Sequence, residues 1–106
     1  MKDIIIAGGF KIVPRHVEEA IYHHAAVQEV AVIGVDDEYR GQSVKAFIVV
    51  KKGQNLTEES LVEFLGDKLG KHEIPKIIEF RNDLPKTMVG KLDKKALKEE
   101  EKNNNG

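Results

Sequence analysis

A lysine near the C-terminal end of the chain lies in a segment whose residue types could do chemistry. In residues 84–95, LPKTMVGKLDKK, Lys91 follows Gly90 and precedes a short helical pattern. A lysine after glycine in a loop carries its charge on a flexible stem, which suits contact with a phosphate or carboxylate delivered by another surface. The residues alone leave an alternative open, a solvated lysine, because most surface lysines bind nothing in particular.

The glycine motifs of the chain do not fit a nucleotide-binding loop. A Walker-type phosphate loop needs Gly five positions before its second Gly and Ser or Thr after the Lys, where this chain has Pro85 and Leu92. Gly8 and Gly9 lack the third spaced glycine of a dinucleotide fingerprint and follow a hairpin strand. The simpler interpretation of this glycine pair is a tight hairpin turn.

The histidines and the paired aspartates form no familiar site. Among the 4 histidines, His16 and His23 share helical spacing, but no carboxylate pair completes a ligand pattern, so we expect no metal site. Asp36 and Asp37 follow a predicted strand. Adjacent carboxylates at such a place usually form a solvated turn, and a general acid or base is the alternative.

The composition limits the class of protein. A chain of 106 residues fits one small domain with a single core. A net charge of -1 gives no electrostatic case for nucleic-acid binding, which needs clustered Lys and Arg. The absence of cysteine excludes disulfides and thiolate chemistry and suits a cytoplasmic protein. The apolar runs are far too short to span a membrane, so we expect a soluble chain without a transmembrane segment.

The first half of the chain predicts a hairpin, a helix and two strands. Apolar residues on both sides of the glycine pair predict a hairpin over residues 4–12. Pro14 suits the first turn of a helix that we expect to run over about 14–24. Two segments rich in β-branched residues, 27–37 and 43–53, are separated by Gly41 and predict paired core strands.

The second half predicts a helix, a strand and a last short helix. Thr57 is a suitable N-cap for a helix with leucines at every fourth position, ending near Gly70. After Pro75, residues 76–80 predict a third core strand, and from Asp93, a possible N-cap, a charged helix follows. The fold class is therefore α+β: an N-terminal β-hairpin and a central, mainly three-stranded sheet flanked by helices.

Three segments in order resemble one family, the small C-terminal domain of adenylate-forming (AMP-binding) enzymes. This family comprises acyl-CoA synthetases, nonribosomal-peptide adenylation domains and firefly-type luciferases. Residues 2–21 resemble its hinge and glycine-loop motif, residues 27–53 its central V-x-E-A-A-V-V-G segment, and residues 84–97 its terminal L-P-K-T-x-x-G-K motif. The resemblance covers nearly the whole chain and is nearest to medium- and long-chain acyl-CoA synthetases, the fatty-acid–CoA ligases.

The resemblance implies a role for several residues. Lys91 matches the catalytic lysine that contacts the acyl carboxylate and the ATP α-phosphate during adenylation. Two further groups match the hinge of the small domain and the loop that lines the passage for the CoA thiol: Lys2 and Asp3 for the hinge, and Gly8, Gly9 and Phe10 for the loop. His72-Glu73 stands where an aromatic residue and a lysine are usual. The candidate contacts to the CoA nucleotide are Arg40, Lys45, Lys71 and His72.

The resemblance also implies a reaction, partners and domain limits. A carboxylic acid, such as a fatty acid, and ATP give acyl-AMP and pyrophosphate, and CoA then displaces AMP. ATP and Mg would be bound mainly by an N-terminal domain of the same polypeptide, so the chain alone should not catalyse. We expect a hinge remnant at 1–3, the C-terminal domain at 4–101 and a disordered tail at 102–106. Two alternatives stay open: a stand-alone non-catalytic binding or regulatory module of the same fold, or an adenylation-domain fragment that loads a carrier protein.

Overall fold

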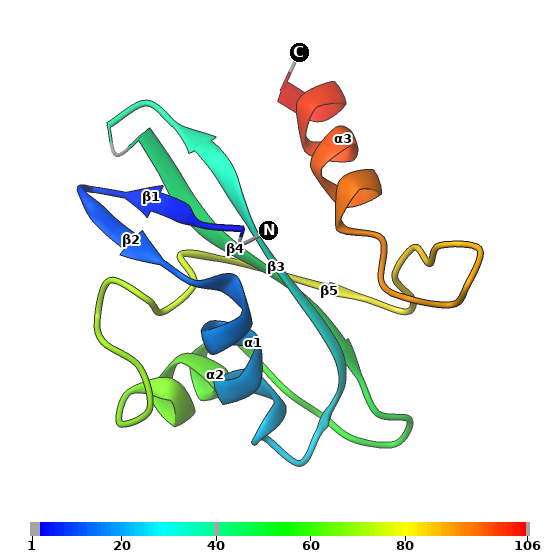
Figure 1. Ribbon diagram of the computed structural model, residues 1–106. Coiled ribbons are helices and arrows are strands. Elements are labelled where there is room, and N and C mark those ends of the chain that lie inside the picture. The colour runs from blue at the N-terminus through cyan, green and yellow to red at the C-terminus, as the bar shows by residue number, and fades with distance from the viewer. Residues whose placement is uncertain (1–2, 40, 106) are drawn as a thin grey trace.

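Two long antiparallel strands form the centre of the fold (Figure 1). A computed structural model describes residues 3–39 and 41–105. Strand β3 (Val27–Asp37) pairs with β4 (Gly41–Val50) along its whole length, from Val27 opposite Val50 to Asp37 opposite Gly41. Both strands are rich in β-branched residues, which pack well on a pleated, buried surface. The predicted pair of core strands is confirmed.

The other side of β4 carries the remaining strands. β5 (Ile77–Arg81) lies parallel to β4, and its Ile77 is opposite Lys45. The hairpin of β1 (Ile5–Ala7) and β2 (Phe10–Ile12) joins the start of β4 through Ala7 and Gly41. β3 is therefore an edge strand of the five-stranded sheet, whose main path runs β2-β1-β4-β3.

Helices cover both faces of the sheet. Helices α1 (Pro14–Tyr22) and α2 (Glu58–Leu65) lie on one face, where Val17, Ile21, Leu61 and Leu65 join the main buried core. Helix α3 (Lys94–Asn105) lies on the opposite face (Figure 1), where Leu97 packs with Phe47 and with residues of β3 in a second core. No helix in the described part of the chain has both the length and the apolar character needed to cross a membrane.

The fold class is confirmed, and the differences lie at the ends of two helices and in the exposure of β5. α2 ends at Leu65, where the Gly66 N–H donates to the Glu63 carbonyl three residues back and the chain continues in turns, in which Leu69 is still buried. β5 is largely half-exposed rather than a core strand, because among the described residues it pairs with β4 alone. α3 continues to Asn105, so residues 102–105 are helical where the sequence predicted a disordered tail. This stretch has no internal proline or glycine to end the helix.

Candidate functional site

Lys91 lies in a loop whose backbone is held by a small set of hydrogen bonds. An isolated bridge joins Lys86 to Leu92, and the Asp93 N–H donates to the Pro85 carbonyl at 2.9 Å. Closer to the tip, the Thr87 N–H donates to the Lys91 carbonyl at 2.7 Å, and the Lys91 N–H donates to Thr87 Oγ1 at 3.2 Å. The main chain of Lys91 is therefore fixed on both its donor and its acceptor side.

The turn at the tip of this loop depends on a glycine and exposes two apolar side chains. Gly90 has φ +85°, a conformation that L side chains rarely adopt, and its N–H donates to the Thr87 carbonyl at 2.9 Å. Met88 and Val89 have relative exposures of 104% and 79%. An exposed apolar tip beside a lysine suits contact with a further protein surface.

The two lysines of the loop of residues 84–93, Lys86 and Lys91, have different surroundings. The Lys86 ammonium lies 3.1 Å from a Glu29 carboxylate oxygen and 3.3 Å from Asp83, and it donates to the Leu84 carbonyl at 3.1 Å. The hydrogen bond to Glu29 is the main cause that raises the pKa of Lys86. Among residues 3–39 and 41–105, no hydrogen bond or ion pair engages the exposed ammonium of Lys91. Of the two lysines in this loop, Lys91 is thus the one whose ammonium is available to a ligand.

The glycine turn of the hairpin has the conformation that glycine supplies. Gly8 and Gly9 have φ values of +57° and +87°, and an added Cβ at either would meet nothing within 4 Å. Backbone conformation, rather than crowding within this chain, therefore favours glycine here. The turn and the loop of residues 84–93 lie at opposite sides of the sheet (Figure 1). A single orientation of the domain cannot present both to one small ligand.

Phe10 and His72 come together, although they were predicted as parts of different subsites. Phe10 is half-exposed, and its ring stacks on that of His72 with centroids 4.3 Å apart and planes 17° from parallel. Lys71, beside His72, is exposed. The structure thus joins the hairpin to the turn that precedes β5 through a pair of rings.

The other predicted site residues are placed differently or lie outside the described residues. Asp3 is exposed, and its carboxylate lies 3.3 Å from the Lys98 ammonium on α3. Lys45 is buried, with its ammonium 2.7 Å from Glu101 and 3.0 Å from Glu79, so two carboxylates already engage its charge. Lys2 and Arg40 lie outside the described residues.

Comparison with known protein families shows to which family the chain belongs. Residues 16–91 match the model of the AMP-binding enzyme C-terminal domain. The chain belongs to this family.

Curated relatives of the domain include long-chain-fatty-acid–CoA ligases, and the chain matches only a small part of their length. It is 54% identical over 103 residues to the long-chain-fatty-acid–CoA ligase of Bacillus subtilis (strain 168), covering 97% of this chain and 18% of that protein. The ligase of the same name from Escherichia coli O6:H1 is 46% identical over 99 residues, covering 93% of this chain and again 18% of that protein. The chain therefore corresponds to less than a fifth of the length of these relatives.

Solved structures give the same result for the fold. The acyl-CoA synthetase of Brucella canis superimposes with a TM-score of 0.92 at 36% identity, covering 98% of this chain and 20% of that one. The fatty acyl CoA synthetase of Mycobacterium tuberculosis superimposes with a TM-score of 0.86 at 35% identity, covering 92% of this chain and 19% of that one. The resemblance to medium- and long-chain acyl-CoA synthetases is confirmed at the level of the family.

Sequence reasoning missed an ion-pair network between the sheet and α3 of the domain. Arg81 lies 2.6 Å from both Glu79 and Glu100, while Lys45 joins Glu79 and Glu101. Burial lowers the pKa of Lys45, but the hydrogen bonds to Glu101 and Glu79 outweigh it, so the pKa is raised. The signal in the sequence was a lysine within the apolar run of β4, since a buried lysine needs partners.

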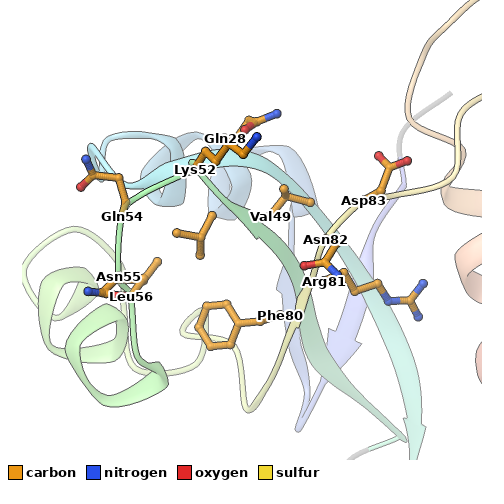
Figure 2. Close-up of a pocket in the computed structure, with 11 residues that line it drawn as sticks. Gln28, Val49, Lys52, Gln54, Asn55, Leu56, Phe80, Arg81, Asn82 and Asp83 are labelled. Atoms are coloured by element: carbon orange, nitrogen blue, oxygen red, sulfur yellow. The ribbon is translucent and has the colours of Figure 1, made fainter.

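An open groove of about 1040 Å³ lies at another place on the domain (Figure 2). Its lining comes from the end of β4, the segment that follows, and the end of β5, and includes Leu56, Phe80 and Asn82. None of the predicted site residues that the structure describes lines it. In residues 3–39 and 41–105, no group of three His, Asp or Glu side chains could hold a metal ion.

Proposed function

We propose that the chain is the mobile C-terminal domain of an ATP-dependent acyl-CoA synthetase that acts on fatty or other carboxylic acids. The two curated relatives described above are named long-chain-fatty-acid–CoA ligases, and the chain covers 18% of the length of each. An N-terminal domain of the same polypeptide would bind ATP, the acid and Mg²⁺. The chain alone would not be catalytically competent, and the whole enzyme would work in the cytoplasm.

In the first half-reaction, Lys91 would supply a positive charge. A carboxylate oxygen of the acid attacks the α-phosphorus of ATP, the bond to the bridging oxygen breaks, and pyrophosphate leaves with that electron pair. Negative charge builds on the oxygens around the α-phosphorus as acyl-AMP forms. A fixed ammonium stabilises this charge more strongly in the transition state than in the bound substrates, which lowers the barrier.

In the second half-reaction, the hairpin would replace Lys91 at the active site. The CoA thiolate attacks the acyl carbon, the bond to the AMP oxygen breaks, and the thioester and AMP result. Gly8 and Gly9 would line the passage for the narrow pantetheine arm, with Phe10 at its side. The domain would turn about a hinge at Lys2 and Asp3 to exchange the two surfaces. Lys45, Lys71 and His72, with Arg40, remain candidates for contacts to the CoA nucleotide.

The observation that carries the proposal is the state of Lys91. At the position matching the catalytic lysine of the family, the chain presents an ammonium that no described residue engages, on a main chain held by hydrogen bonds on both sides. A side chain that only stabilised the fold would be expected to have a partner within the domain, as Lys86 has in Glu29. The arrangement suits a cation that works on a ligand held by a second domain.

The test compares Lys91→Ala with Lys95→Ala in the full-length ligase. Lys95 is also exposed and lies in the first turn of α3, so its loss controls for the removal of a surface charge. We expect Lys91→Ala to lower fatty-acid-dependent ATP–pyrophosphate exchange by about a hundredfold or more, the magnitude of losing one preorganised charge-stabilising group, while Lys95→Ala exchanges normally. Undiminished exchange in Lys91→Ala would refute the proposed role.

A further inference from the structure

The Glu18 carboxylate connects three elements, α1, β3 and α3, beside the loop of residues 84–93, called the Lys91 loop below. Glu18 on α1 accepts a hydrogen bond from the Val32 N–H on β3 at 2.8 Å through Oε2. The same oxygen lies 2.6 Å from the ammonium of Lys94 at the start of α3. The side chains of Glu18 and Lys94 are 15% and 29% exposed. The contact is therefore short, largely shielded from water, and made between residues far apart in the chain.

The edge position of β3 explains why Glu18 is well held. Within the part of the chain that the structure describes, strand β3 pairs with β4 alone, so the N–H groups on its outer side have no strand partner there. Side chains of α1 take up two of them: the Tyr22 hydroxyl accepts from Val30 at 3.3 Å, and Glu18 accepts from Val32. Hydrogen bonds to a charged acceptor are stronger than neutral ones. The hydrogen bond from Val32 thus holds the Glu18 carboxylate against the sheet independently of its ion pair with Lys94.

Both ends of the Lys91 loop are tied to this edge of the sheet. On the side before Lys91, Lys86 binds Glu29 of β3. On the side after Lys91, Lys94 binds Glu18. The short segment from Lys91 to Lys94 contains Leu92, which packs against the second core. The loop can therefore move little relative to β3, while the ammonium of Lys91 extends from it without a partner in the described chain.

We infer that Glu18 and Lys94 are positioning residues for Lys91 in the adenylation half-reaction. The inference rests on the function proposed above for Lys91. The Glu18 carboxylate and the Lys94 ammonium are occupied with each other, so they act through the main chain and not on substrate. Their effect is to keep the Lys91 ammonium at the distance from the α-phosphate at which it stabilises the transition state. A misplacement of about 1 Å in such a site can cost about a hundredfold in rate.

The first variant is Glu18→Gln in the full-length ligase. Its amide oxygen can still accept from the Val32 N–H, but the charge that holds Lys94 is lost. We expect ATP–pyrophosphate exchange to fall by about 10- to 100-fold. Thioester formation from supplied acyl-AMP and CoA, which does not use Lys91, should stay within about twofold of the wild type, because the loss is confined to the placement of Lys91. Glu19→Gln is the matched control, since Glu19 is the next residue of α1 and pairs on the surface with Arg15 at 3.6 Å.

A second set of variants covers the case in which Glu18→Gln folds poorly. Lys94→Met removes the pair but leaves the bond between Glu18 and Val32 in place, and it should lower exchange to a similar extent. Lys94→Arg keeps the charge and should retain most of the exchange activity. In a Lys91→Ala background, Glu18→Gln and Lys94→Met should cause no further loss, because they act through Lys91.

The possible outcomes separate this inference from the proposed function. Equal losses in both half-reactions would show a general structural role and overturn the inference, as would additive losses in the Lys91→Ala background. Normal exchange in both Glu18→Gln and Lys94→Met, with Lys91→Ala inactive, would overturn the positioning role and leave the function of Lys91 intact. Normal exchange in Lys91→Ala would overturn the proposed function and this inference with it.

Discussion

The Lys86 ammonium lies 3.1 Å from the Glu29 carboxylate on β3, whereas the ammonium of Lys91, in the same loop, meets no carboxylate of the described chain. The hydrogen bond to Glu29 raises the pKa of Lys86, and the Leu84 N–H and Lys86 together lower the pKa of Asp83. Lys86 therefore holds the loop against the sheet, and the ammonium of Lys91 extends from the loop without a partner in the described chain.

The first prediction concerns the attachment of the loop through Lys86. In the full-length ligase, Lys86→Met should lower ATP–pyrophosphate exchange by less than Lys91→Ala does, because it loosens the loop but leaves the reacting charge in place. Glu29→Gln should have the same effect, and the double variant should be no worse than either single one, since both remove one contact. Strictly additive losses in the double variant would contradict a shared contact.

The second prediction concerns the hairpin turn. Gly9→Val places a β-branched side chain at φ +87°, which we expect to cost about 1–3 kcal/mol of folding free energy. It should also slow thioester formation from acyl-AMP more than it slows ATP–pyrophosphate exchange, because the added side chain would narrow the passage for the CoA thiol.

Gly53→Val is the control for the hairpin variant. Gly53 has φ +81° with nothing within 4 Å of an added Cβ, so the substitution introduces the same backbone strain in the segment after β4. Both variants should lower the melting temperature to a similar extent, and only Gly9→Val should impair thioester formation selectively. Equal slowing of the two half-reactions in Gly9→Val would count against a role in the thiol passage.

Local chemistry in the sequence predicted the local elements. The Thr57 side chain accepts from the Ser60 N–H at 3.1 Å, and the Asp93 carboxylate accepts from the Ala96 N–H at 3.1 Å, so both predicted N-caps are confirmed. Caps and glycine turns depend on residues a few positions apart, which a sequence pattern records directly. The limits of α2 and α3 were less predictable, because helix ends also depend on tertiary packing.

The site contacts could not be predicted in the same way, because they join distant parts of the chain. Lys86 and Glu29 are separated by 57 positions, and Lys45 and Glu101 by 56. No spacing rule relates such pairs, so the sequence could not identify Glu29 as the partner of Lys86 or Glu101 as that of Lys45, nor show that Lys91 has no partner in the described chain. The assignment of Lys91 came from resemblance to the family, and the geometry adds a physical reason for preferring it.

The third prediction is a pH dependence of stability that arises from Glu79. Burial raises the pKa of Glu79, but hydrogen bonds from Arg81 and Lys45 outweigh this and hold the pKa below its ordinary value of 4.5. The stabilising contribution of Glu79 is therefore complete above pH 4.5 and is lost as the pH falls through the lowered pKa. In thermal melts, the difference between the wild type and Glu79→Gln should shrink below pH 4.5.

Glu38→Gln is the control for the pH experiment. Glu38 is exposed in the turn between β3 and β4, and its replacement should leave the acid side of the stability profile nearly unchanged. A gap between the wild type and Glu79→Gln that stays constant from pH 7 to pH 3 would contradict the assigned linkage.

The last prediction separates two roles for Lys45. Lys45→Met leaves Glu101 and Glu79 without the ammonium between them, and we expect it to destabilise the domain by about 1–3 kcal/mol. This is less than for a fully buried pair, because Glu79 is partly exposed and keeps Arg81 as a partner. Adding Glu101→Leu to Lys45→Met should recover part of that loss, since it removes the uncompensated carboxylate.

If Lys45 has this structural role alone, the KM for CoA of the Lys45→Met variant of the full-length ligase should be unchanged. A raised KM for CoA with an unchanged melting temperature would instead support the predicted contact to the CoA nucleotide, because the loss would then be confined to CoA binding.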